Sequence, residues 1–408
     1  MRVYIADKFE QFGIDELRHS GCDVSYEPGK KGAEFAAAVR DSACRVLVVR
    51  STKVPREVIA AANELALIVR AGAGVDNIDV AAASAHSVLV ANCPGMNAIA
   101  VAELTLALVL SLDRRVPDAT ADLRAGKWNK TEYAKAAGLK GRTLGLLGLG
   151  PIGRAVAARA AAFEMNVVAW SRSWASPAAA LPGVHLKRAA REVAELADVV
   201  SVHLASTPQT RGLVDRAFFE AMRPGASFVN TSRGDLVDTA ALTWAVKEKK
   251  LRVGLDVWAA EPAAAVADFA DPLLSSGGVV YGTPHVAAST EQAQMAIAAE
   301  TVRLVRRFRD TGRVDNCVNL SPRSAAQHIL IVRHRNRPGV LAHVLSHLGA
   351  AGLNVEEMEN TILADQATAV ARIAVSGAPA DALLGAIRGG NDAILALSVV
   401  ELPAAPAD

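Results

Sequence analysis

A glycine-rich loop constrains the fold of this chain more than any other feature. Gly148-Leu149-Gly150-Pro151-Ile152-Gly153 follows the apolar run RTLGLL and precedes the helical stretch RAVAARAAAF. In this context the first glycine permits a tight turn, the second lets a pyrophosphate approach the backbone, and the third allows close helix–strand packing. Pro151 suits a first helical turn, whose N-terminus attracts anions. The loop predicts a dinucleotide-binding α/β unit; the alternative is a turn that binds nothing.

Short β-type runs recur on both sides of this loop at the spacing of βα units. Five lie before it, at 2–6, 22–26, 45–49, 65–69 and 88–92. Six follow Lys140, at RTLGLLG, 165–170, 198–204, 226–232, 252–258 and 279–285. They predict parallel sheets covered on both faces, the second of them doubly wound. The apolar stretch Ala98 to Leu112 between the two series predicts a long central helix.

A third unit follows the polar stretch NLSPRSAAQ. Its strand-like runs are 328–333, 353–360, 367–375 and 393–402, and its helical stretches are 338–350 and 379–388. The order βαββαβ predicts a small sheet with two helices on one face.

Composition narrows the classes of partner. A hydrophobic fraction of 51% supports a large core, and 44 basic against 42 acidic side chains give a net charge of +2, without the basic excess that nucleic acids select. Four dispersed cysteines indicate neither a disulfide framework nor a metal site. The charged N-terminus does not suit a signal peptide, and no apolar run reaches the ~20 residues that span a bilayer. We expect a cytoplasmic protein without nucleic-acid, membrane or metal partners.

The end of the second strand in the dinucleotide unit bears on cofactor choice. The fingerprint expects an acidic residue there for the ribose 2′-hydroxyl, but this chain has Ser171, Arg172 and Ser173. These donors suit a 2′-phosphate, so NADP(H) is slightly favoured over NAD(H). The alternative is that Arg172 stacks on the adenine and NAD(H) still binds.

Charged residues follow three consecutive strands of the same unit, where open α/β sheets place their chemistry. Arg233 follows ASFVNTS, Glu261 follows RVGLDVW, and His285 ends VVYGTPH. Each alone is usually a surface residue. Together, a base, a carboxylate that orients it and a clamp for a substrate carboxylate predict an oxidoreductase site.

Several motifs, in order, resemble the D-isomer-specific 2-hydroxyacid dehydrogenases, and among them the phosphoglycerate dehydrogenases. They are VRSTKV, RAGAGVDNID, the glycine-rich loop, MRPGASFVNTSRGDLVD, GLDVWAAEP and TPHVAAST. The resemblance implies a Rossmann-type domain (98–288) inserted into a flavodoxin-like substrate domain (1–97 and 289–316). A linker (317–326) and an ACT-like regulatory domain (327–404) would follow.

The resemblance also implies roles for single residues. Arg233 matches the arginine that holds the substrate carboxylate, Glu261 the dyad carboxylate, and His285 the acid/base for the C2 hydroxyl. Asp256 matches the acceptor for the nicotinamide carboxamide, while His203 faces the cleft without an assigned role. The cofactor set is Gly148, Gly150, Pro151, Ile152, Gly153, Ser171, Arg172, Ser173, Thr231 and Asp256.

A substrate phosphate is expected in the N-terminal lobe. The candidates are Arg50, Ser51, Ala73, Gly74, Asn97 and Lys130. Lys130 matches a basic residue that some family members present to a neighbouring subunit, and a homodimer or homotetramer is implied. The alternative for Arg50 is a solvated charge after a strand.

The third unit resembles the ACT module through HRNRPGVL and GLNV. Serine-inhibited family members hold serine at matching positions between two modules, which implies an effector site at His334, Asn336 and Asn354. The alternative is a module that only dimerises.

The implied reaction is oxidation of 3-phosphoglycerate to 3-phosphohydroxypyruvate, the first step of L-serine synthesis, with feedback by serine. One alternative is a glyoxylate/hydroxypyruvate reductase or another D-2-hydroxyacid dehydrogenase, which would share the three catalytic residues. Another is a dinucleotide-sensing, corepressor-like interaction protein.

Overall fold

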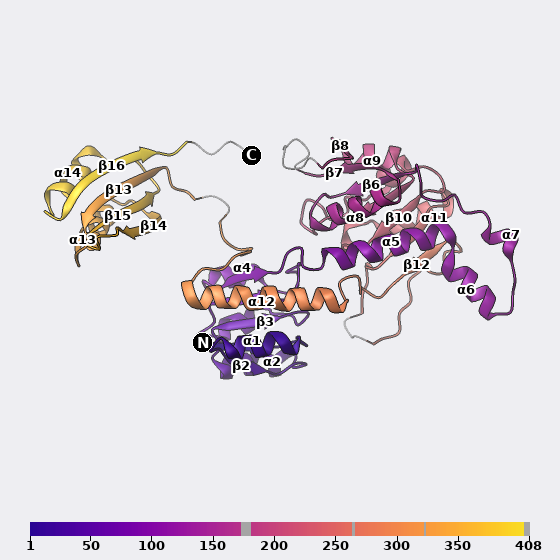
Figure 1. Ribbon diagram of the computed structural model, residues 1–408, viewed down its shortest axis with the longest axis horizontal. Coiled ribbons are helices and arrows are strands. Elements are labelled where there is room, and N and C mark those ends of the chain that lie inside the picture. Colours follow the sequence, from indigo (N-terminus) through magenta and orange to yellow (C-terminus); the bar gives the residue numbers. More distant parts are fainter. Residues whose placement is uncertain (173–180, 263–265, 322–323, 404–408) are drawn as a thin grey trace. The chain divides into compact units, whose positions relative to one another are not determined.

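The computed structural model describes residues 1–172, 181–262, 266–321 and 324–403. The chain forms two compact units, Met1–Asn319 and Leu320–Asp408. The first contains a five-stranded and a seven-stranded parallel sheet, and the second contains a four-stranded antiparallel sheet (Figure 1).

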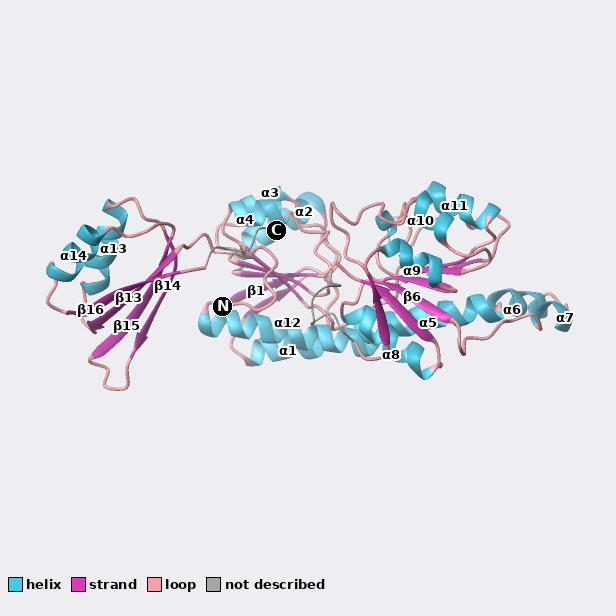
Figure 2. Ribbon diagram, turned by 90° about the horizontal axis from the view of Figure 1, so that it is seen from above, coloured by secondary structure: helices cyan, strands magenta, loops and turns pink. Residues whose placement is uncertain are grey.

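The five-stranded sheet has the order β2-β1-β3-β4-β5. Its strands are β1 (Arg2–Ile5), β2 (Asp23–Tyr26), β3 (Val46–Val49), β4 (Leu67–Arg70) and β5 (Leu89–Asn92). Helices α1 (Gln11–His19) and α12 (Glu291–Thr311) cover one face; α2 (Gly32–Ser42), α3 (Arg56–Ala61) and α4 (Val80–Ala85) cover the other (Figure 2). Because α12 is far from the other helices in sequence, the chain returns to this sheet after building the second one.

The seven-stranded sheet has the order β12-β11-β10-β9-β6-β7-β8, and all pairs are parallel. Its strands are β6 (Thr143–Leu147), β7 (Asn166–Trp170), β8 (Val184–Lys187), β9 (Val199–Val202), β10 (Ser227–Asn230), β11 (Arg252–Leu255) and β12 (Val280–Gly282). The six predicted strands are present, and β8 is a seventh. This edge strand, VHLK, is only partly buried, so it lacks the continuous apolar run of a central strand.

Helices sandwich this sheet. Those on one face are α5 (Ala98–Arg114) and α8 (Pro151–Ala162), and those on the other are α9 (Ala190–Leu196), α10 (Arg216–Ala221) and α11 (Thr239–Glu248). The 3-10 turn η2 (Gly234–Leu236) precedes α11. Beyond α5, the helices α6 (Val116–Arg124) and α7 (Lys130–Tyr133) bury no side chain and extend away from the sheet (Figure 1). The central helix predicted at 98–112 corresponds to α5.

The C-terminal unit has the order β14-β15-β13-β16, with both helices on one face (Figure 2). Its elements are β13 (His328–Arg335), α13 (Val340–Ala350), β14 (Val355–Ile362), β15 (Thr368–Val375), α14 (Asp381–Gly389) and β16 (Ile394–Glu401). Alternate residues of β13 and β15 enter its core, as a two-sided sheet requires. The predicted fold class, a Rossmann-type sheet inserted into a flavodoxin-like one plus a βαββαβ unit, is confirmed.

The predicted linker needs a correction at its start. Cys317 forms an antiparallel bridge with Ala91, and the Val318 N–H donates to the Val90 carbonyl at 2.8 Å. The Asn319 side chain accepts from the Val90 N–H at 2.8 Å and donates to the Val88 carbonyl at 2.9 Å. Residues 317–319 therefore belong to the edge of the first sheet, because they satisfy backbone groups that β5 would otherwise leave open.

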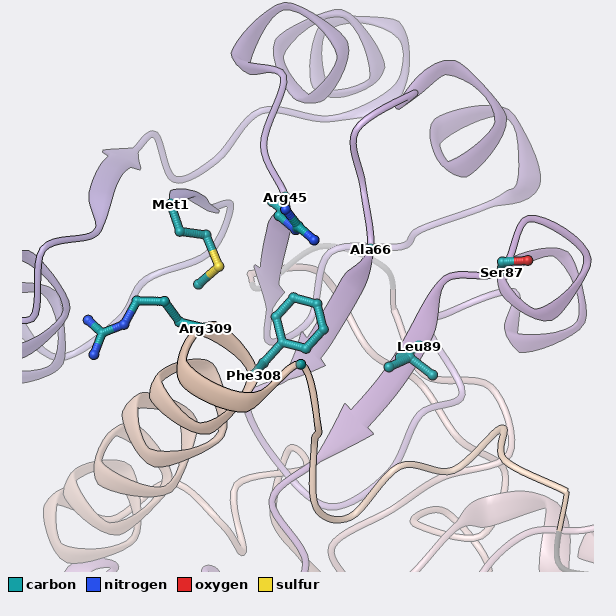
Figure 3. A pocket seen from close by; sticks show the side chains of 8 residues that line it. Met1, Arg45, Ala66, Ser87, Leu89, Phe308 and Arg309 are labelled. Atoms are coloured by element: carbon teal, nitrogen blue, oxygen red, sulfur yellow. The ribbon is translucent and has the colours of Figure 1, made fainter. Parts of the chain in front are cut away.

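A pocket of about 540 Å³ lies at the N-terminal edge of the five-stranded sheet (Figure 3). Met1, Arg45, Ala66, Leu89 and Phe308 are among the residues that line it. It lies away from the carboxyl ends of the strands, where the predicted catalytic residues are found. Among the described residues, none of the helices has the length and apolar character needed to cross a membrane. Nor do three metal-ligating side chains come together anywhere in the described ranges.

Candidate active site

The glycine-rich loop connects β6 to α8 and leaves the N-terminus of that helix accessible. Gly148 has φ +105°, and a Cβ added there would lie 2.9 Å from the carbonyl carbon of His203 and closer still to its oxygen. A Cβ at Gly153 would clash with the carbonyl of Gly148. Around Gly150, by contrast, no atom lies within 4 Å of an added Cβ, and α8 has no side-chain cap. Gly148 and Gly153 have no room for a side chain, whereas the space around Gly150 is open. This arrangement suits a dinucleotide pyrophosphate at the start of α8.

The neighbouring residues complete this cofactor cradle. Pro151 occupies the first turn of α8, and the partly buried Ile152 packs on the core beneath. The Gly148 N–H donates to the Trp170 carbonyl at 2.8 Å, which brings the end of β7 beside the loop. There Ser171 is half-buried and Arg172 is exposed, while Ser173 lies outside the described residues.

His203 lies buried behind the loop. Its Nε2 is 2.9 Å from the Ser201 hydroxyl, and its Nδ1 has no hydrogen-bond partner in the described part of the chain. Burial lowers the pKa of His203 to about 3, so the ring is neutral.

His285 and Glu261 form a hydrogen-bonded pair. His285 Nδ1 lies 2.7 Å from Glu261 Oε2, and Glu261 Oε1 accepts from the Trp258 N–H at 3.0 Å. Burial alone would raise the pKa of Glu261, but the hydrogen bonds from His285 and Trp258 outweigh it, and its pKa is lowered. The carboxylate is therefore charged at neutral pH and fixes the ring through Nδ1, which leaves Nε2 available to exchange a proton.

Asp256 shapes the turn that carries His285. Its fully buried carboxylate accepts from the Thr283 hydroxyl at 2.6 Å and from the N–H groups of Val286 and Ala287 at 2.8 and 2.9 Å. His285 itself has φ +53°, a conformation that a non-glycine residue keeps only when its surroundings hold it. The three donors on Asp256 thus come from the protein, in addition to any role toward nicotinamide.

Arg233 follows β10 and reaches the loop after β4. The Asn230 side chain braces the turn by donating to the Arg233 carbonyl at 2.8 Å and accepting from the Ser232 N–H at 3.0 Å. Nε and Nη2 of Arg233 both lie 3.0 Å from Asp76 Oδ2. The hydroxyl of Thr231, a residue predicted to contact the cofactor, lies 3.0 Å from the Thr105 hydroxyl of α5.

Arg70, at the end of β4, is a further candidate that sequence reasoning missed. Its guanidinium packs directly against Gly72, and its Nε has no hydrogen-bond partner among the described residues. Burial, then the nearby Arg233 and Arg50, lower the pKa of Arg70 to about 10. The guanidinium groups of Arg233 and Arg50 are thus near enough to Arg70 for their charges to repel it. The signal was available, since Arg70 ends a parallel strand just as Arg233 follows one.

The loop after β3 is folded around Asp7. The Asp7 carboxylate accepts from the N–H groups of Arg50, Ser51 and Thr52 at 2.6, 3.0 and 3.0 Å, and from the Ser51 hydroxyl at 3.2 Å. Burial would raise the pKa of Asp7, but the three N–H donors and the Thr52 hydroxyl, which donates at 2.9 Å, lower it. Asp7 engages the predicted Ser51 hydroxyl, whereas the Arg50 guanidinium lies near Arg70.

Three of the remaining substrate candidates lie at the same edge. Gly74 packs on the Arg233 guanidinium, and the Ala73 carbonyl accepts from the Asn92 side chain at 2.5 Å. Asn97 precedes α5, and its buried Oδ1 has no partner within the described ranges. Lys130 instead begins α7, on the extension remote from the five-stranded sheet (Figure 1).

Within one C-terminal unit, the predicted effector residue Asn354 lies far from His334 and Asn336. His334 pairs with Ala369 at one end of β15, whereas Asn354 adjoins Val355, which pairs with Val375 at the other end. His334 is buried with Nε2 3.1 Å from Asn360 Oδ1, and Asn336 donates to the Gln366 carbonyl at 3.1 Å. Because β15 has eight residues, strand geometry separates the two groups by ~20 Å.

Comparison with known proteins agrees with this arrangement. The family profile described as "D-isomer specific 2-hydroxyacid dehydrogenase, NAD binding domain" matches residues 106–287. The D-3-phosphoglycerate dehydrogenase of Methanocaldococcus jannaschii is 39% identical over 325 residues, which cover 78% of this chain and 60% of that protein. The chain thus spans about three fifths of the length of this curated relative.

Solved structures show the same fold over the first unit. The TT0316 protein from Thermus thermophilus matches with a TM-score of 0.69 and 34% identity, covering 78% of this chain and 100% of that one. An NAD+-bound 3-phosphoglycerate dehydrogenase from Entamoeba histolytica matches with a TM-score of 0.65 and 25% identity, covering 78% and 99%. On sequence, fold and site, the chain belongs to the D-isomer specific 2-hydroxyacid dehydrogenase family.

Proposed function

We propose that this chain is a D-3-phosphoglycerate dehydrogenase, which oxidises 3-phosphoglycerate to 3-phosphohydroxypyruvate with a nicotinamide dinucleotide. One observation carries the proposal: the charge of Arg233 acts both on Glu261 of the His285–Glu261 pair and on Arg70, which is also near Arg50. A small acid with a single carboxylate needs one such clamp. A three-carbon acid that also bears a phosphate gives the additional cations a partner.

His285 acts as the base in the oxidation. Its Nδ1 is held by Glu261, so Nε2 takes the C2 hydroxyl proton and returns it in the reverse reaction. A bound nicotinamide dinucleotide supplies the hydride acceptor. Arg233 holds the substrate carboxylate, and the charged Glu261 stabilises the imidazolium that forms.

Arg50 and Arg70 hold the phosphate. A buried guanidinium with an unpaired Nε is costly unless an anion meets it, and a phosphate offers several acceptor oxygens. The unpaired Oδ1 of Asn97 supplies an acceptor for a substrate hydroxyl.

The side chains beside the glycine-rich loop also bear on the choice between NAD(H) and NADP(H). Ser171 and Arg172 beside the loop favour NADP(H) slightly over NAD(H), because a guanidinium pairs with a 2′-phosphate. Arg172→Ala should raise the KM for NADPH and leave that for NADH nearly unchanged. Equal KM changes for the two nucleotides would contradict this assignment.

Regulation by serine and homo-oligomerisation are proposed together. Since Asn354 lies at the opposite end of the sheet from His334 and Asn336, a serine site that uses all three takes them from two copies of the chain. Calorimetry should detect serine binding to the wild type and lose it in Asn336→Ala; no heat with the wild type would eliminate the site. We also propose a cytoplasmic location, in keeping with four unpaired thiols.

The test of the central proposal is an assay of NADH and NADPH oxidation with 3-phosphohydroxypyruvate, hydroxypyruvate and glyoxylate. The expected result is the highest kcat/KM for the phosphorylated acid. A much higher value for glyoxylate would instead assign a glyoxylate reductase. Dinucleotide binding without hydride transfer to any of these acids would favour a sensing, corepressor-like role.

A further inference from the structure

Asp76 contacts the guanidinium of Arg233 from a loop of the other sheet. It lies in the loop after β4 of the five-stranded sheet, whereas Arg233 follows β10 of the seven-stranded sheet. One oxygen, Asp76 Oδ2, receives both Nε and Nη2 of Arg233 at 3.0 Å. The contact therefore joins the two sheets of the first unit directly at the proposed substrate site.

The contact with Asp76 leaves part of the Arg233 guanidinium free for another partner. A guanidinium has five N–H donors in one plane. Asp76 accepts from the Nε–H and forms an ion pair with Nη2, and the Ser232 carbonyl accepts from Nη1 at 2.7 Å. At least one N–H therefore remains on each of the two terminal nitrogens. That is the pair a carboxylate engages with both of its oxygens.

The surroundings make this orientation specific. Gly74 packs on Nη2 so closely that an added Cβ there would clash with it, and that Cβ would also lie 3.0 Å from Asp76 Oδ2. The loop and the carboxylate thus approach the guanidinium together. Asp76 also brings a negative charge to a site with three guanidinium groups, and it counteracts the repulsion that Arg233 and Arg50 exert on Arg70.

We propose that Asp76 is a positioning residue, which occupies the side of the Arg233 guanidinium so that its end faces the carboxylate of a 2-keto or 2-hydroxy acid. This inference rests on the proposed function for the identity of the substrate, but the contact itself does not depend on it. The side chains of Asp76 and Arg233 are 59% and 33% exposed, so the pair contributes little to global stability. Its effect is on geometry.

The test compares Asp76→Asn with Asp79→Asn in the full chain. Asp79 lies three residues away and caps α4 by accepting from the Ala82 N–H at 2.8 Å, a role that asparagine fills equally well. Both variants remove one carboxylate charge from the same loop, but only the first removes it from Arg233. Asp79→Asn is therefore a matched control.

Kinetics give the first measurement. Misorientation of a clamp costs about 10- to 100-fold, so Asp76→Asn should lower kcat/KM by that factor for every 2-keto acid that the wild type reduces. The Kd for NADH and the Tm should stay near wild type, and Asp79→Asn should change none of these quantities. Asp76→Glu should restore part of the loss. If both asparagine variants have the same kcat/KM, the proposal is overturned.

Amide hydrogen exchange gives a second measurement that needs no substrate. Asp76→Asn should raise exchange in residues 71–77 and 231–236 together, because the contact joins the two segments. Asp79→Asn should leave residues 231–236 unchanged. If the wild type reduces no 2-keto acid, the proposed function fails, yet the paired rise in exchange would still support the positioning role; unchanged exchange at 231–236 would refute it.

Discussion

Gly150→Ala tests the dinucleotide site with little disturbance of the fold. Gly150 has φ −68° and ψ −172°, which alanine adopts without strain, and the added methyl group meets no atom within 4 Å. Open-surface substitutions change stability by about 0.5 kcal/mol or less, so the Tm should move by about 2 °C at most. The methyl group would, however, stand where a pyrophosphate must approach the start of α8.

The expected loss of affinity follows from the hydrogen bonds that this approach makes. A hydrogen bond to a charged group contributes about 1.5–3 kcal/mol, so losing one raises the Kd for NADH by about 10- to 100-fold. Fluorescence titration with NADH measures the Kd, and differential scanning fluorimetry measures the Tm of the same sample.

Gly148→Ala is the matched control. Its positive φ disfavours alanine by about 1–2 kcal/mol, and the contact with the His203 carbonyl adds about 1–3 kcal/mol of overpacking. This variant should therefore lose at least about 4 °C of Tm. Wild-type NADH affinity in Gly150→Ala would refute the position assigned to the pyrophosphate. If the Tm of Gly150→Ala falls as far as that of Gly148→Ala, the space around Gly150 is not open.

Three further predictions concern the proposed reaction. His285→Asn should lower kcat by about 10²- to 10⁴-fold while the Kd for NADH stays constant, and a matching loss of NADH affinity would contradict a purely acid–base role. The lowered pKa of Glu261 means that its charged form stabilises the fold above its ordinary pKa of 4.5, a contribution lost as the pH falls through the lowered pKa. The Tm difference between wild type and Glu261→Gln should accordingly shrink on acidification below that pH, whereas a constant difference would show that ionisation is not involved. Arg50→Ala should raise the KM for 3-phosphohydroxypyruvate by about 10-fold and leave that for hydroxypyruvate unchanged, and initial rates with the two acids would show an equal rise if Arg50 does not hold the phosphate.

Sequence patterns predicted the elements whose conformation is determined by residues close together in the chain. The loop at Gly148 and the apolar run of α5 carry their own geometric requirements, so both were predicted correctly. The edge strand β8 was missed because VHLK is half-exposed and pairs on one side only.

Contacts between distant segments could not be predicted in the same way. The burial of Arg70, the ion pair of Arg233 with Asp76, and the three donors on Asp256 all depend on where separate loops meet. A pattern along the chain gives the residue types present at an edge of a sheet. It does not give the partner that each side chain finds there.

The attachment of residues 317–319 to β5 gives this strand contacts with two distant parts of the chain. Everything beyond Leu320 is tethered to a strand whose far end supports the loop of Ala73 and Gly74: the Asn92 side chain donates to the Ala73 carbonyl, and the Cys93 N–H donates to the Gly72 carbonyl at 2.9 Å. The segment that leads into the C-terminal unit and the loop of Ala73 and Gly74 are therefore supported by the same strand.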